Sequence, residues 1–242
     1  MVDAHCHIDL FPDPYHIIEE SDRKGIFVLA MTNLPSHFQR GRSHIKANGK
    51  TRLALGLHPL YAAKHVNELS LFEQFLHQTS YVGEVGLDFS KEGISTKDLQ
   101  IRSFEFLLHL VTGKKKILSL HSRGAETEVL SYLLRYNIKL AIFHWYSGPE
   151  KLVESIVSAG FLFSINPAMA RSKKGAELIK MIPLDHILTE SDGPFVMLNG
   201  RAAEPTDMES VEQQISHIKA IPQAMVSRAI SSNFKKLINH LR

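Results

Sequence analysis

The chain has 242 residues, of which 44% are hydrophobic and 22% charged, and its formal net charge of +3 neither requires nor excludes a nucleic-acid partner. Its one cysteine, Cys6, excludes an intrachain disulfide and a cysteine-rich zinc module. No apolar stretch reaches the ~18 residues of a membrane span, and the N-terminus lacks the order of a signal peptide, so we expect a soluble, cytoplasmic protein.

Short apolar runs rich in β-branched residues alternate with longer segments of helical periodicity. Strands are predicted at residues 2–5, 26–31, 52–57, 81–85, 117–121, 140–144, 161–165 and 186–189. Helices are predicted at residues 15–23, 36–47, 69–77, 99–112, 126–135, 149–159, 174–181 and 208–220, with a last one at 223–241. Asp13 and Pro14 suit the start of the first helix as cap and first-turn proline, and Gly25 suits its end.

This alternation gives eight strand–helix units without a linker, a low-complexity tract or a repeat. Eight such units in a chain of this length predict an α/β fold of the (β/α)₈ TIM-barrel type, formed by a single domain over residues 1–242. An open doubly wound sheet has the same local pattern and is the alternative. The number of strands favours the barrel.

Fourteen histidines are many for this length, and histidine is the commonest metal ligand. The metal-ligating side chains at or just beyond the end of a predicted strand are His5, His7, Glu84, Asp88, His121, His144 and Asp192. In a barrel these ends meet at one rim, where this fold builds its active sites. A lone histidine at a strand end is more often structural, so the prediction of an N/O metal site depends on the whole set.

In the first predicted strand, the alternation of side chains separates candidate metal ligands from packing residues. His5 and His7 are two residues apart, so their side chains face one side of the strand and Cys6 faces the other. We therefore expect Cys6 to be a small buried apolar residue. Glu84 ends an otherwise apolar strand, where an acid is costly to bury unless it is paired or metal-bound.

Six short segments carry most of these residues and occur along the chain in this order: DAHCHID, GLHP, VGEVGLDF, LSLHSRGA, FHWYSG and LTESDGPF. In order and spacing they resemble the TatD-type metal-dependent hydrolases, and ISSNFKKLI near the C-terminus resembles that family's closing helix. The resemblance covers essentially the whole chain. It implies an amidohydrolase-like TIM barrel with two divalent metal ions (Zn²⁺, Mg²⁺ or Mn²⁺) and phosphodiesterase activity on DNA.

The same resemblance assigns metal ligands block by block. His5 and His7 resemble the ligands of one metal, and Glu84 resembles the carboxylate that bridges the two metals and takes part in catalysis. His121 and His144 resemble ligands of the second metal. Each of these residues also stands at a predicted strand end, so the family resemblance and the strand pattern select the same positions.

Two further positions, and some departures, concern catalysis and substrate. Asp192 resembles the acid that binds the first metal and orients the nucleophilic water, and His58 resembles a residue near the scissile phosphate. The family usually has histidine where this chain has Leu60, and alanine or serine where it has Gly193. The segment HWYSG stands where the family more commonly has HCFSG. Its Trp145 adds a face for base stacking.

Phosphate binding needs cations at the same rim. Arg123 follows His121 closely and can hold a phosphate with its planar fork, while Lys173 and Lys174 follow a later strand. Residues 113–116 (GKKK) precede a strand, so we expect a solvated loop at the opposite end of the barrel. No motif that reads base sequence is present, and Trp145 can stack on a base. We therefore predict DNA binding with weak sequence preference, on single strands or ends.

The amino-acid sequences of four segments are most similar to those of the TatD-type members of Qat anti-phage gene clusters: DAHCHIDLFPDP, HSRGAETEVL, HWYSG and SINPAM. That similarity implies a part in anti-phage defence, with other Qat-system proteins as partners; a monomer is favoured. One alternative is a small-molecule or D-aminoacyl-tRNA ester or amide hydrolase of the amidohydrolase superfamily. Another is a non-catalytic scaffold subunit of a defence complex, against which the intact ligand set argues.

Overall fold

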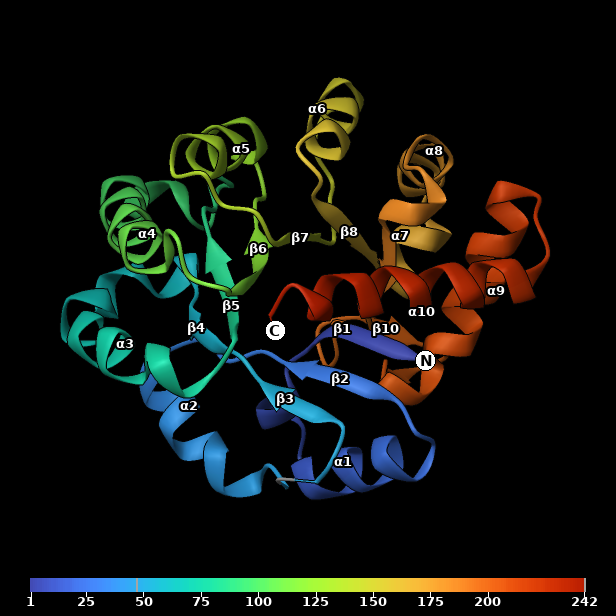
Figure 1. Cartoon of the computed structure of the whole chain (residues 1–242), viewed down its shortest axis with the longest axis horizontal. Coiled ribbons are helices and arrows are strands. Elements are labelled where there is room, and N and C mark those ends of the chain that lie inside the picture. Colours follow the sequence, from blue (N-terminus) through green and yellow to red (C-terminus); the bar gives the residue numbers. More distant parts are fainter. Residues whose placement is uncertain (47, 242) are drawn as a thin grey trace.

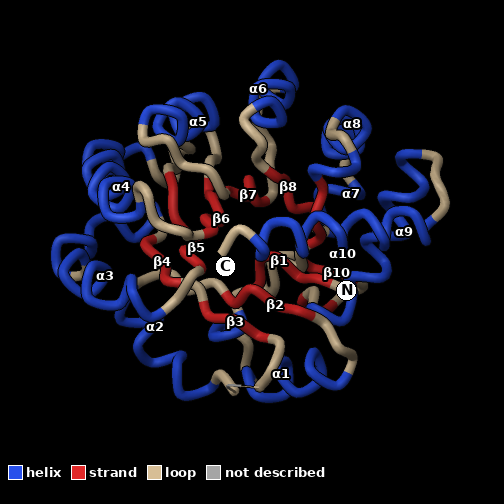
Figure 2. The backbone as a smooth tube through the Cα atoms, in the orientation of Figure 1, coloured by secondary structure: helices blue, strands red, loops and turns tan. Residues whose placement is uncertain are grey.

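The computed structural model describes residues 1–46 and 48–241, which form a barrel of parallel strands surrounded by helices (Figures 1 and 2). One sheet has the strand order β1 (Val2–Cys6), β2 (Phe27–Ala30), β3 (Thr51–Leu53). The other has the order β4 (Leu55–Leu57), β5 (Tyr81–Gly86), β6 (Ile117–His121), β7 (Ala141–His144), β8 (Leu162–Ile165), β9 (Ile187–Thr189). Every pairing within these two sheets is parallel.

The two sheets join into one barrel. β3 and β4 form the third predicted strand, interrupted at Ala54, whose N–H still donates to the Ala30 carbonyl at 2.8 Å. On the other side β9 lies beside β1, where the Thr189 hydroxyl donates to the Val2 carbonyl at 2.6 Å. With β3 and β4 counted as one strand, the (β/α)₈ TIM barrel predicted from the sequence is confirmed.

Helices follow the strands around the barrel: α1 (Pro14–Arg23), α2 (Pro35–Gly41), α3 (Leu69–Phe75), α4 (Lys97–Val111), α5 (Glu126–Arg135), α6 (Val153–Ser158), α7 (Pro167–Arg171), α8 (Lys173–Met181), α9 (Met208–Lys219) and α10 (Gln223–Asn239). The helices cover the outer face of the barrel, whose inner face is closed on itself, and strands such as β7 and β8 are buried along their whole length. This burial explains their continuous apolar sequence. No described helix is long and apolar enough to cross a membrane.

The first helix begins as its sequence predicts. The Asp13 carboxylate accepts a hydrogen bond from the N–H of His16 at 3.0 Å, and Pro14 occupies the first turn. The cap satisfies a backbone donor that has no partner within the helix. Gly25 follows the helix with φ of +69°, a conformation that glycine adopts without steric cost.

Several short elements differ from the prediction. The helix predicted at 36–47 ends at Gly41 and continues as one 3₁₀ turn, Arg42–His44; its predicted last residue, Ala47, lies outside the described residues. Helix α7 and the hairpin of β10 (Met197–Leu198) and β11 (Arg201–Ala202) were not predicted. They are too short to show periodicity, although Asn166 caps α7 by accepting from the N–H of Met169 at 2.8 Å.

The last helix closes one end of the barrel. The Phe234 ring lies 4.6 Å from that of Phe27 at the start of β2, and the Asn233 amide donates to the carbonyls of Leu184 and Ile187, where β9 begins. Helix α10 thus crosses the N-terminal ends of the strands (Figures 1 and 2). The C-terminal ends of the strands lie at the opposite end of the barrel from α10.

Candidate metal centre

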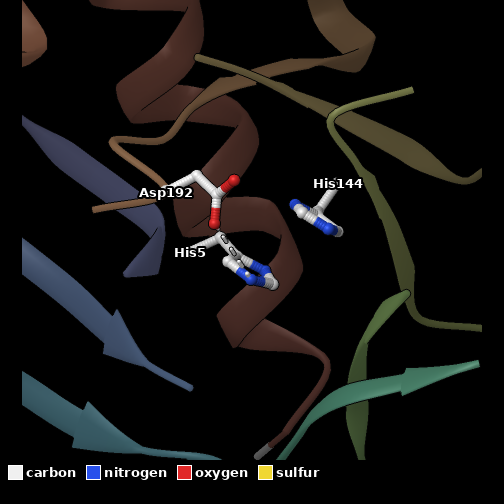
Figure 3. Close-up of side chains that lie close together, drawn as sticks. All are labelled: His5, His144 and Asp192. Carbon is white, nitrogen blue, oxygen red and sulfur yellow. Dashed lines mark ion pairs between the residues drawn. The ribbon is translucent and has the colours of Figure 1, made fainter. Parts of the chain in front are cut away.

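The structure brings the six predicted metal ligands together at the C-terminal end of the barrel: His5, His7, Glu84, His121, His144 and Asp192. They come from β1 and the residue after it, from β5, β6 and β7, and from the segment after β9, and none of their side chains is more than 14% exposed. Figure 3 shows His5, His144 and Asp192 pointing toward one another from three separate elements. We call these six residues the metal centre.

Glu84 lies in the middle of the metal centre, and its two carboxylate oxygens face different histidines. Oε2 lies 3.1 Å from His7 Nε2 and 3.5 Å from His5 Nε2. Oε1 lies 3.0 Å from His144 Nε2 and 2.5 Å from His121 Nδ1. One carboxylate thus faces two pairs of imidazoles, the arrangement needed by a group that bridges two cations.

The spacing of the donor atoms around His5 and His7 fits a shared metal ion. Two ligands held 2.0–2.1 Å from one Zn²⁺ at a tetrahedral angle are roughly 3.3 Å apart. Here the two Nε2 atoms are 3.2 Å apart, and Asp192 Oδ1 lies 3.8 Å from His5 Nε2 and 3.9 Å from His7 Nε2. Together with Glu84 these residues form a compact set of nitrogen and oxygen donors that suits a divalent cation.

Two of the imidazoles are oriented by side chains behind them. His5 Nδ1 lies 2.8 Å from the Ser119 hydroxyl, which leaves Nε2 directed toward Glu84. His121 Nε2 lies 2.7 Å from Asp88 Oδ2, which leaves Nδ1 directed toward Glu84. Partners of this kind fix the ring and the tautomer of metal-binding histidines.

Glu190 has the corresponding position behind His144, and the sequence reasoning missed it. This fully buried carboxylate lies 3.5 Å from His144 Nδ1. It also accepts from the Asn166 amide at 3.1 Å, from the N–H of Trp145 at 3.0 Å and from the Ser164 hydroxyl. Glu190 therefore ties the ends of β7, β8 and β9 together. The signal in the sequence is the first acid of LTESDGPF, two residues before Asp192.

The electrostatics of the metal centre favour a positive charge. Burial acts to raise the pKa of Glu84, but the facing His58 and His144 hold it well below its usual range. Burial acts to lower the pKa of His144, yet Glu84 and Glu190 keep it well above its usual range. Burial and the neighbouring His144 lower the pKa of His5. The cluster therefore combines an ionised Glu84 and a neutral His5 with a proton held on His144, and a bound metal ion would take the place of that proton.

The pKa of Asp192 is shifted in the opposite direction from that of Glu84. Burial raises its pKa to about 7, and the nearby charge of Glu190 acts in the same direction, although His144 opposes both. Its backbone has a φ of +47°, and its N–H donates to the His5 carbonyl at 2.9 Å. This contact places the carboxylate beside the first strand.

Two glycines let the backbone approach these residues closely. Gly86 has φ of +136°, and a Cβ there would lie 2.0 Å from the carbonyl oxygen of His121. A Cβ at Gly193 would lie 2.0 Å from the carbonyl oxygen of Ala203 and 2.7 Å from the Phe11 ring. Since a side chain at Gly193 would displace the segment before α9, the local packing explains why this chain has no alanine or serine there.

His58 also lies within the cluster. Its Nε2 atom is 3.3 Å from Glu84 Oε2, and it could share a cation with Glu84 and His121. The sequence reasoning assigned it to the substrate instead. Its Nδ1 accepts from the N–H of Leu60 at 3.1 Å, so the turn after β4 directs Nε2 toward the metal centre.

A cavity of about 580 Å³ opens above the metal centre. Its other lining residues are Asn33, Leu60, Tyr61, Ser122, Arg123, Trp145, Ser147 and Phe195. Trp145 is 37% exposed and Phe195 is 58% exposed, so large apolar faces border a polar floor. Among the described lining residues, Arg123 is the one lysine or arginine, and it lies 3.5 Å from Glu92 in an exposed ion pair.

The two predicted lysines lie farther from the floor of this cavity. Lys173 begins α8 and is exposed, and neither lysine is among the residues that line the cavity. The Lys174 ammonium donates to the carbonyl of Ser147, which does line it. Lys174 thus reaches the rim, and Lys173 precedes it at the start of α8.

Comparison with known proteins gives consistent matches. A family model described as TatD related DNase matches residues 2–239. Human deoxyribonuclease TATDN3 is 25% identical over 262 residues, which cover 100% of this chain and 96% of the human one. An uncharacterized metal-dependent hydrolase of Buchnera aphidicola (strain Bp) is 26% identical, with 99% and 96% covered. The crystal structure of YJJV, a TatD homolog from Escherichia coli K12, gives a TM-score of 0.86 at 24% identity, with 98% and 97% covered.

Proposed function

The chain belongs to the TatD family of metal-dependent hydrolases, and from this membership we propose that it is a deoxyribonuclease that hydrolyses phosphodiester bonds of DNA. As a member it is a hydrolase acting on ester bonds. The observation that carries the proposal is Glu84, whose two oxygens face separate pairs of imidazoles at the floor of an open cavity. With divalent cations bound, such a floor would suit a phosphate as the substrate group.

We assign two divalent cations, Zn²⁺, Mg²⁺ or Mn²⁺, to the metal centre. His5, His7 and Asp192 would hold one of them, His121 and His144 would hold the other, and Glu84 would contribute an oxygen to each. When bound, such ions make water more acidic and neutralise charge on a phosphate.

The chain's own groups then have defined tasks. Asp192 borders both the cavity and the first histidine pair, and it accepts the proton of the attacking water. Arg123 holds a non-bridging phosphate oxygen from the rim, which its exposed side chain and loose pairing with Glu92 allow. His58 lies between the metal centre and the cavity mouth, where it contacts the scissile phosphate.

The form of the DNA follows from the cavity walls. Trp145 and Phe195 offer exposed ring faces, which stack on unpaired bases but not on bases inside a duplex. We therefore propose exonuclease action on single strands or ends with weak sequence preference. Lys174 at the rim, with Lys173 beside it, attracts the phosphates that follow.

We further place the protein in the cytoplasm as a single-domain monomer of residues 1–242 that serves Qat-type anti-phage defence with other Qat-system proteins. Support comes from the motifs DAHCHIDLFPDP, HSRGAETEVL, HWYSG and SINPAM. Phage plaque counts in cells carrying the whole gene cluster test this role. Protection that survives Glu84→Gln would contradict a catalytic part in it.

One observation favours a second candidate function. The cavity has apolar walls and, among its described lining residues, Arg123 as its one lysine or arginine. An ester or amide of a small molecule or of a D-aminoacyl-tRNA would bind against such walls with less need for cations. In that case the metal centre would act on a carbonyl group instead of a phosphate.

The decisive experiment compares substrates. The purified protein is incubated with single-stranded DNA, double-stranded DNA, RNA and a series of small esters, each with Mg²⁺, Mn²⁺ or Zn²⁺. We expect cleavage of single-stranded DNA that is lost with EDTA and in Asp192→Asn. Cleavage that persists in both controls would contradict the metal-dependent mechanism. Turnover of esters without turnover of DNA would replace the first candidate by the second.

A further inference from the structure

Asn33 is a buried polar residue just beyond β2 that is not part of the metal centre. It is 2% exposed, and its side chain lines the cavity of about 580 Å³ above the metal centre. The buried Oδ1 atom of its amide accepts no hydrogen bond from residues 1–46 and 48–241. A buried polar atom without a partner is costly, and most such atoms in folded proteins have one. An unpartnered amide oxygen at the wall of a cavity therefore points to a ligand.

The backbone around Asn33 is bonded to the site on both sides. The N–H of the preceding Thr32 donates to the Gly83 carbonyl at 3.2 Å, and the Thr32 carbonyl accepts from the N–H of Glu84 at 3.1 Å. The Asn33 carbonyl accepts from the N–H of His58 at 2.9 Å. The unpartnered amide thus extends from a backbone that is fixed beside Glu84 and His58.

Asn166, which follows β8, shows how the barrel treats a buried amide with a structural role. It is fully buried, its Oδ1 accepts from the N–H of Met169 at 2.8 Å, and its Nδ2 donates to Glu190 at 3.1 Å. Asn33 has a similar place beyond a strand end, but its oxygen has no such partner. The fold therefore does not account for the amide of Asn33 in the way that it accounts for that of Asn166.

The unpartnered oxygen limits the chemistry of the ligand. Oδ1 is an acceptor, so its partner must offer an N–H or O–H group. A phosphodiester offers acceptors alone and would leave Oδ1 unsatisfied. The edge of a nucleobase offers a donor beside an acceptor, and an asparagine amide can pair with such an edge through its N–H and its oxygen together.

The ring of Tyr61 lies on the same wall of the cavity. The N–H of Tyr61 donates to the His58 carbonyl at 2.9 Å, and the Tyr61 ring lies 5.9 Å from the His58 ring. Asn33, His58 and Tyr61 all line the cavity. This wall therefore offers an aromatic surface for the face of a base and an amide for its edge.

We propose that Asn33 binds the edge of an unpaired nucleobase of the substrate. The inference rests on the proposed deoxyribonuclease function, and it adds a polar base contact to the stacking surfaces of Trp145 and Phe195. All four bases have a donor beside an acceptor on the edge that pairs in a duplex, and an amide can present its two groups in either order. The contact therefore selects unpaired bases over paired ones, with little preference among the four.

The test uses two substitutions of Asn33 and a matched control. Asn33→Ala removes the amide, and Asn33→Leu removes its polar atoms while keeping a side chain of similar size. The control is Asn233→Ala: Asn233 is 3% exposed and donates to the carbonyls of Leu184 and Ile187 at the other end of the barrel. Binding of a labelled thymidine decanucleotide is measured by fluorescence anisotropy in Ca²⁺. A series of decanucleotides with one abasic residue each, placed at successive positions, removes single bases but keeps the phosphates and the terminal hydroxyls.

We expect the parent to bind about three- to tenfold more weakly when one particular position is abasic, because the hydrogen bonds to that base are lost. Both Asn33 variants should bind the intact strand more weakly by the same factor and show no further loss at that position. Their melting temperatures should stay within about 2 °C of the parent's, because Oδ1 has no partner in the chain to lose. Asn233→Ala should melt several degrees lower and bind DNA as the parent does.

Two results would overturn the base contact while leaving the proposed function intact. One is an affinity of the Asn33 variants equal to the parent's, which would give Asn33 a packing role. The other is a loss of the same size with every abasic strand, which would assign the amide to the DNA backbone or to a terminal hydroxyl. A parent protein that neither binds nor cleaves DNA would overturn the deoxyribonuclease function, and the base contact with it.

Discussion

The two ends of the barrel are built on the same strands but handle charge in opposite ways. At the metal centre, imidazoles and carboxylates are buried and face each other at 2.5 to 3.9 Å. At the opposite end, in the loops before β6 and β7, the side chains of Lys114 and Lys139 are exposed to solvent. Buried charges must compensate one another, whereas solvent can tolerate unpaired ones.

This difference determines what a substitution does at each end. Removing one group from the metal centre leaves its buried partners without compensation, so effects on binding and stability are coupled. Removing one exposed lysine changes the local potential and little else. Glu84 has the most buried partners, so its substitution tests this contrast most directly.

Glu84→Gln should have the largest effect. The substitution removes the charge that faces both pairs of imidazoles while keeping the size of the side chain. Loss of several kcal/mol of transition-state stabilisation predicts a fall in hydrolytic rate of about 10³-fold or more. Metal content after dialysis, measured by mass spectrometry, should fall together with the rate.

The matched control for that variant is Glu212→Gln. Glu212 is equally buried but belongs to α9, where it accepts from the hydroxyl of Ser227 on α10. It should lower stability without changing metal content. If both variants retained the metal of the parent protein, Glu84 would not be a ligand.

Glu190→Gln should weaken metal binding without abolishing it. Glu190 contacts His144 from behind and holds the Trp145 backbone, so the substitution loosens both. Removal of such supporting carboxylates typically costs 10–100-fold in metal affinity or activity. Titration of the metal-free protein with Zn²⁺ checks this, and nitrogen NMR of His144 reports its tautomer. An unchanged tautomer with unchanged affinity would show that Glu190 only packs.

Trp145→Ala should weaken binding of single-stranded DNA without lowering metal content. Loss of one base-stacking contact costs about 1–3 kcal/mol. Tyr15→Ala removes another exposed aromatic side chain, outside the cavity, and serves as control. Affinity measured by fluorescence anisotropy in Ca²⁺ should fall for Trp145→Ala alone. Equal affinities of the two variants would remove Trp145 from the proposed DNA path.

The sequence predicts the parts of this molecule that depend on position along a strand. The barrel follows from eight alternating units. His121 and His144 stand out because they end β6 and β7, and His5 stands one residue before the end of β1. Residues at strand ends converge in any closed parallel barrel, so no knowledge of packing is needed. Cys6 is likewise buried, as alternation along β1 predicts.

Features that depend on contacts between distant segments were not predictable. Glu190 acquires its role because β9 places it beside the end of β7, and Phe195 joins Trp145 at the cavity only once both loops are folded. The segment 113–116 was expected to be a solvated loop at the far end; the structure places it there, but beside Lys139 and His240 around a cavity. Periodicity contains no information on such pairings.

The smallest effect concerns acid stability at the metal-centre end, where His65 is 2% exposed. Its Nε2 donates to the His58 carbonyl at 3.0 Å, and burial lowers its pKa from 6.5 to about 4. Between these two values the unfolded chain binds the proton more readily, so the free energy of unfolding falls as pH drops from 6.5 and levels off below 4. His65→Gln keeps a donor for the His58 carbonyl but cannot titrate. Urea unfolding at pH 7.5 and pH 5 should therefore show a loss smaller than the parent's by up to about 2 kcal/mol, whereas equal losses would mean that His65 protonates without opening the fold.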